Sequence, residues 1–153
     1  MEKLDKDLQN RVWQRVQSRE KLEMPPLGQE NLRPLILTVQ ENRQVYQNLS
    51  HQMPGKDGDR IRRLQQECQK CITCMKGICC IRGEPVQVPQ LNMGKEQPKR
   101  ALMKCYHRER KLCADLDRMS ADPEYGTIYS ALSRQAKERC VAVLELLGEL
   151  EKQ

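Results

Sequence analysis

Four stretches of this 153-residue chain share one pattern, in which inward positions recur at alternating steps of three and four residues. Such spacing places side chains on one face of an α-helix, because a helix completes a turn every 3.6 residues. With no Phe and 3% aromatic residues, the chain is poorly suited to a β-sandwich or barrel. Four amphipathic helices therefore predict an all-α four-helix bundle. The four stripes are Leu32, Leu35, Val39, Asn42, Tyr46 and Leu49; Ile61, Leu64, Cys68, Cys71, Met75 and Ile78; Leu102, Cys105, Glu109, Leu112, Leu116 and Met119; and Tyr129, Leu132, Ala136, Arg139, Val143 and Leu146.

The connections between these helices differ in length. Short turns are predicted at Met53 to Gly58 and at Ala121 to Gly126, whereas a Pro- and Gly-containing stretch from Ile81 to Gln97 separates the second and third bundle helices. This stretch is long enough to cross the length of the bundle, so these two helices are expected to run parallel. We predict a single bundle domain over residues 28–153, preceded by a helix and linker over residues 1–27.

The predicted N-terminal helix, from about Leu4 to Ser18, is amphipathic. Leu4, Leu8, Val12 and Val16 form one stripe, with Trp13 beside it. Because the polar face mixes acids, bases and amides, we expect packing on its own bundle or on a second copy rather than on a membrane surface. Packing on a second copy would make the chain a homo-oligomer, for which Trp13 is a plausible anchor.

Charge and the N-terminal sequence restrict the partners and the compartment. The chain has 27 Lys and Arg against 21 Asp and Glu, and the net charge of +6 is spread over both halves. The densest basic cluster, residues 60–63, fits a solvated helix face, so no nucleic-acid partner is expected. No apolar stretch fits a transmembrane segment or a signal peptide, which predicts a cytoplasmic protein. In that reducing compartment the eight cysteines would be thiols, metal ligands or core residues.

The two helix pairs on either side of the long connection look alike. Val39 precedes the pair Cys68-x-x-Cys71, and Cys105 precedes the pair Ala136-x-x-Arg139 by nearly the same number of residues. Apolar residues stand seven and four positions before each pair. The pattern therefore predicts that the two helix pairs are an internal repeat.

This arrangement resembles the ferritin-like superfamily, and most of all its rubrerythrin branch. The resemblance is carried by residues 35–46 (LILTVQENRQVY) and 122–144 (DPEYGTIYSALSRQAKERCVAVL), and it covers about residues 32–150. It implies two helix pairs joined by a crossover. In the family, each pair supplies one inward Glu and a Glu-x-x-His, which together hold two iron or manganese ions.

The sequence departs from the family at these ligand positions. Neither Val39 nor Ala136 has a ligand atom, and Arg139 is a fixed cation that repels a metal. The leading hypothesis is therefore a ferritin-like protein without the usual dimetal ligands, which has no catalytic residue or cofactor and a non-enzymatic binding or assembly role. The corresponding positions are Val39, Cys68, Cys71, Cys105 (or Glu109 if the helix shifts by one turn), Ala136 and Arg139.

Polar residues on the inward stripes need partners, because a buried unpaired charge is costly. Glu109 and Arg139 lie at similar depth on consecutive helices, so we predict a buried ion pair between them, with Asn42 as a further candidate partner. The alternative is that one of the two long side chains reaches solvent.

Two other functions remain open from the sequence. Cys68, Cys71 and Cys105 could form a thiolate pocket for zinc or copper(I), although core packing is favoured for them. The adjacent Cys79 and Cys80, near a helix end, are expected to be exposed and reactive, which would suit a redox or metal-handling protein. The last alternative is an iron or manganese oxidoreductase with a rearranged site around Glu67, Glu109 and His107.

Overall fold

A computed structural model describes residues 31–152, which form four helices. They are α2 (Arg33–Gln52), α3 (Gly55–Ile81), α4 (Pro98–Met119) and α5 (Gly126–Glu151). Within this range the remaining residues form turns and loops and none forms a strand, which confirms the prediction of an all-α four-helix bundle. The helix predicted near the N-terminus lies outside the described residues.

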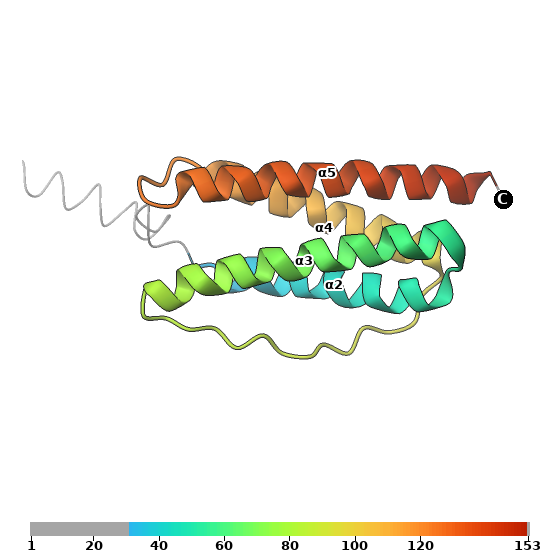
Figure 1. The fold of residues 1–153 in the computed structure, drawn as a ribbon, viewed down its shortest axis with the longest axis horizontal. Helices are drawn as coiled ribbons and strands as arrows, with labels where there is room; N and C mark the ends of the chain where they lie inside the picture. The colour runs from blue at the N-terminus through green and yellow to red at the C-terminus, as the bar shows by residue number, and fades with distance from the viewer. Residues whose placement is uncertain (1–30, 153) are drawn as a thin grey trace, which may run out of the picture.

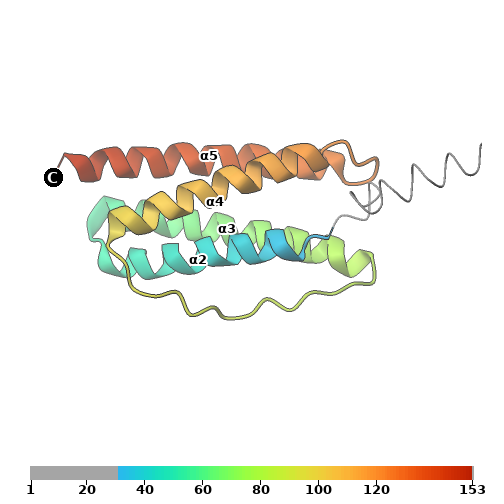
Figure 2. The same cartoon turned by 180° about the vertical axis from the view of Figure 1, so that it is seen from behind.

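The helices are arranged as two antiparallel pairs. Helix α2 packs on α3 and α4 packs on α5, while α2 with α4 and α3 with α5 join the two pairs. The connection between α3 and α4 runs along the whole length of the bundle (Figures 1 and 2). Helices α3 and α4 therefore run in the same direction, as the length of the connection predicted.

The core lies between the four helices and is built from the predicted stripes. Every stripe residue is buried, including the polar Asn42, Glu109 and Arg139. Burial of the apolar members supplies the main driving force for folding. The three polar members are placed inside the core by the same helical period, so each must find its partners there.

Two buried glutamines hold the long connection against α2. The Gln44 side chain donates from Nε2 to the Leu91 carbonyl oxygen at 2.5 Å, and its Oε1 accepts from the Leu91 amide at 2.6 Å. Gln40 donates from Nε2 to the Pro89 carbonyl oxygen at 2.9 Å. Side-chain amides thus pair with a backbone that has no neighbouring strand to bond with.

Glycines permit a close approach of backbone at the start of α3 and α5. A Cβ at Gly58 would overlap the Met53 carbonyl oxygen, and a Cβ at Gly126 would overlap the Ser120 carbonyl oxygen. These glycines stand ten positions before Cys68 and Ala136 respectively, so they extend the internal repeat to the turns. None of the helices in residues 31–152 is long and apolar enough to cross a lipid bilayer.

Candidate functional site

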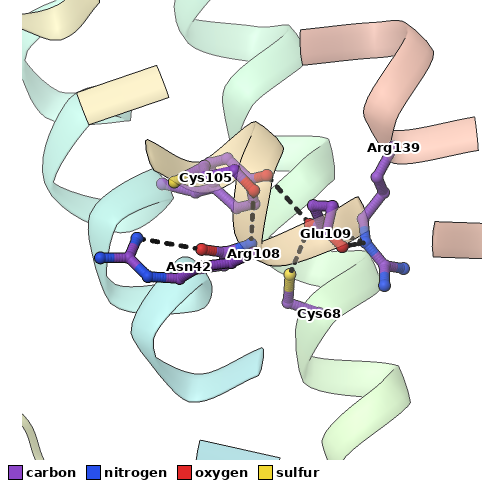
Figure 3. A network of polar contacts seen from close by, with 7 residues as sticks. Asn42, Cys68, Cys105, Arg108, Glu109 and Arg139 are labelled. Atoms are coloured by element: carbon purple, nitrogen blue, oxygen red, sulfur yellow. Dashed lines mark hydrogen bonds and ion pairs between the residues drawn. The ribbon is translucent and has the colours of Figure 1, made fainter. Parts of the chain in front are cut away.

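An ion pair between Glu109 of α4 and Arg139 of α5 lies in the centre of the bundle. The Arg139 Nε donates to both Glu109 carboxylate oxygens, at 3.0 Å each, and each side chain is 1% exposed. Figure 3 shows the guanidinium and the carboxylate approaching each other from the two helices. The predicted buried ion pair is confirmed, and neither side chain reaches solvent.

The Glu109 carboxylate also accepts hydrogen bonds from the other helix pair. The Tyr46 hydroxyl of α2 donates to Oε2 at 3.0 Å, and the Cys68 thiol of α3 lies 3.9 Å from the same oxygen. A carboxylate on α4 is therefore bonded to side chains from all three other helices. Several donors offset the cost of removing this charge from water.

Of the three guanidinium nitrogens of Arg139, only Nε donates a hydrogen bond to Glu109. Its Nη1 and Nη2 are buried and have no hydrogen-bond partner among the described residues, and the Cys68 and Cys71 thiols are its other electrostatic neighbours. Burial lowers the pKa of Arg139, but Glu109 and the two thiols outweigh this effect and raise it overall. Arg139 is therefore a permanent cation, and the Glu109 carboxylate balances its charge.

Asn42 lies beside the ion pair without joining it. Its Nδ2 donates to the Cys105 carbonyl oxygen at 3.2 Å, and its Oδ1 accepts from Arg108 Nη1 at 3.2 Å. The expectation that Asn42 pairs with Glu109 or Arg139 was wrong, because its short amide is engaged by α4 one turn earlier. Asn42 instead links α2 to α4 (Figure 3).

The three cysteines considered for a soft-metal site are all in the core. Cys68, Cys71 and Cys105 are at most 1% exposed. Burial raises the pKa of Cys71 to about 11 and that of Cys105 to about 12, and it raises the pKa of Cys68 well above its ordinary value. These thiols are therefore protonated at neutral pH, whereas a metal ligand must be the thiolate.

The vicinal cysteines at the end of α3 have different environments. Cys80 is exposed, as expected, but Cys79 is buried. The expectation was wrong for Cys79 because α3 continues to Ile81 and turns this thiol towards the core beside Ile78. Burial also raises the pKa of Cys79, which makes it less reactive.

The remaining candidate positions are not gathered into one site. Val39 and Ala136 are buried core residues, whereas Glu67 and His107 are exposed on the outer sides of their helices. Among residues 31–152, no three His, Cys, Asp or Glu side chains are grouped so that they could hold a metal ion.

Sequence reasoning missed the role of Tyr46. It was placed on an inward stripe, but no partner was predicted for its hydroxyl. The available signal was that a buried Tyr hydroxyl usually finds a hydrogen-bond partner, and Glu109 was the acidic residue on the inward stripes.

In comparisons with known proteins, no family model, no curated protein and no solved structure matches this chain.

Proposed function

We propose that this chain is a ferritin-like bundle in which the Glu109–Arg139 ion pair stands where the family holds two metal ions, and that it acts in binding or assembly rather than in catalysis. The observation that carries the proposal is the buried ion pair itself, with 3.0 Å contacts and 1% exposure on both sides. The carboxylate that a metal would need is already engaged by donors from three helices.

Charge balance supports the same proposal. A dimetal site in the resembled family is neutralised by four carboxylates, whereas the corresponding positions here hold apolar residues, thiols, one carboxylate and one guanidinium. The carboxylate and the guanidinium neutralise each other. Binding two divalent cations next to Arg139 would leave a large excess of buried positive charge, which is strongly unfavourable.

The test is a metal analysis of the full chain, purified without a chelator from cells supplied with iron, manganese, zinc and copper. We expect all four metals well below one ion per chain. Two iron or manganese ions per chain, lost in Glu109→Gln but kept in the control Glu138→Gln at an exposed position of α5, would contradict the proposal and favour the oxidoreductase.

The same analysis separates the thiol-based alternative. Zinc or copper(I) bound in stoichiometric amount, and lost in Cys71→Ala, would favour a soft-metal function over the proposed one. Thiol titration measures independently which cysteines are accessible, because core cysteines react only after denaturation. We expect Cys80 to react in the folded protein and Cys68, Cys71 and Cys105 to react only in denaturant.

A further inference from the structure

Met103 of α4 and Leu144 of α5 are exposed apolar side chains on the flanks of the seam between these helices, and Val141 neighbours Leu144 one turn earlier on the outer side of α5. Met103 is 46% exposed, Val141 54% and Leu144 48%, and they are three of the five large apolar residues exposed in the described part of the chain. We call these three residues the α4/α5 patch. The other two, Ile81 and Ile128, lie at the end of α3 and the start of α5.

Two ion pairs between α4 and α5 place Met103 and Leu144 at about the same level along the bundle. Lys99 pairs with Glu151 and Glu109 with Arg139, which fixes the antiparallel register of the two helices. Met103 stands one turn after Lys99, and Leu144 stands two turns before Glu151, so both lie on the flanks that face each other. Helices α4 and α5 pack directly against each other.

Half-buried apolar residues extend the patch towards the core. Tyr106 of α4 and Leu147 of α5 pack against the core while remaining partly exposed. Several apolar residues on neighbouring flanks of a water-exposed helix pair are typical of a site that another element covers.

The chain itself contains a segment that fits this surface. Residues 4–18 carry an apolar stripe on a predicted amphipathic helix, formed by Leu4, Leu8, Val12, Trp13 and Val16. We propose that this N-terminal segment docks in cis on the α4/α5 patch and buries Trp13 there. The inference goes beyond the proposed function and does not depend on whether the core binds a metal.

The linker is long enough for this docking. Helix α2 begins at the same end of the bundle at which α5 begins (Figure 1). Leu144 lies about 27 Å along α5 from Gly126, at 1.5 Å per residue. Residues 19–30 span at most about 40 Å when extended, which covers this distance and a helix-to-helix spacing of about 10 Å across the bundle.

Trp13 is the single tryptophan of the chain, so its fluorescence reports directly on the docking. The experiment measures the emission maximum and acrylamide quenching of the full chain, of Leu144→Lys and Val141→Lys, and of the control Ile128→Lys. The control places the same charge at an exposed apolar position of α5 that lies outside the patch. Circular dichroism confirms that each variant keeps its helices.

We expect blue-shifted, protected Trp13 emission in the wild type and in Ile128→Lys. In Leu144→Lys and Val141→Lys the emission should move to that of the urea-unfolded chain, with increased quenching. Wild-type emission already equal to that of the unfolded chain, or emission unchanged in both patch variants, would overturn the proposal. Protection that is lost on dilution, together with a fall in mass from dimer to monomer by sedimentation, would assign the patch to a second copy and also overturn docking in cis.

Discussion

At the scale of single residues, Glu109 and Arg139 form an ion pair inside the core. A buried ion pair gains little over a well-packed apolar pair, but loss of one partner strands the other charge in the interior. We predict that Arg139→Met lowers the free energy of unfolding by about 3–5 kcal/mol, because Glu109 then lacks its cation. Urea unfolding monitored by circular dichroism measures this loss.

The matched control for this substitution is Arg134→Met, which makes the same change at an exposed position of α5. It should alter the free energy of unfolding by less than about 0.5 kcal/mol. The double variant Glu109→Leu/Arg139→Met should recover most of the loss, since no buried charge remains. A single Arg139→Met variant as stable as the wild type would show that the pair does not organise the core.

The buried thiols predict a dependence of stability on alkaline pH. Burial raises the pKa of Cys105 from 9.0 to about 12, so the unfolded chain loses this proton before the folded chain does. The stabilisation is complete below about pH 9 and is lost between about pH 9 and pH 12, at up to about 1.4 kcal/mol per pH unit. Urea unfolding in reductant across this range should show a shallower pH slope for Cys105→Ala.

Cys80→Ala is the matched control for the pH experiment, because Cys80 is exposed and its removal should leave the slope unchanged. The comparison uses slopes rather than absolute stabilities, since Cys105→Ala also leaves a cavity in the core. If the free energy of unfolding falls equally steeply with pH in the wild type and in Cys105→Ala, the pKa of Cys105 is the same in the folded and the unfolded chain, which would contradict the prediction.

At the scale of the helices, glycines decide where α3 and α5 can begin. We predict that Gly126→Ala destabilises the fold by about 1–3 kcal/mol, because the added methyl group overlaps the Ser120 carbonyl oxygen and must displace backbone. Thermal unfolding measures the change. Gly148→Ala on the same helix meets nothing within 4 Å and should instead stabilise it by about 1 kcal/mol. The same sign for both variants would contradict this explanation.

The helices and their inward faces were predictable from the sequence, whereas several polar contacts were not. The alternating spacing placed Glu109 and Arg139 inside because helical period fixes which residues share a face. The buried Gln40 and Gln44 were not predicted, since amide residues one turn apart are typical of a solvated face. Their burial depends on where the long connection lies, which no local pattern specifies. Asn42 shows the same limit, because its partner is set by the α2–α4 contact.

At the scale of the whole molecule, the buried polar centre around Glu109 connects the two helix pairs. Tyr46, Cys68 and Arg139 bring the other three helices to Glu109, so the centre joins the two halves of the internal repeat. A dimetal centre would join the same halves through metal–ligand bonds. We propose that in this bundle hydrogen bonds and charge pairing at Glu109 take the place of such metal–ligand bonds.

The most direct test is the free energy of unfolding of the wild-type chain in excess Fe²⁺, Mn²⁺ or Zn²⁺, compared with the value in chelator. A metal that binds the folded state alone adds about 2.7 kcal/mol when its concentration is a hundred times its dissociation constant. We predict no change with any of the three ions, because the Glu109 carboxylate is already paired. A stabilisation of this size that is abolished in Glu109→Gln and kept in the exposed-position control Glu138→Gln would show that the bundle does hold a metal ion at Glu109.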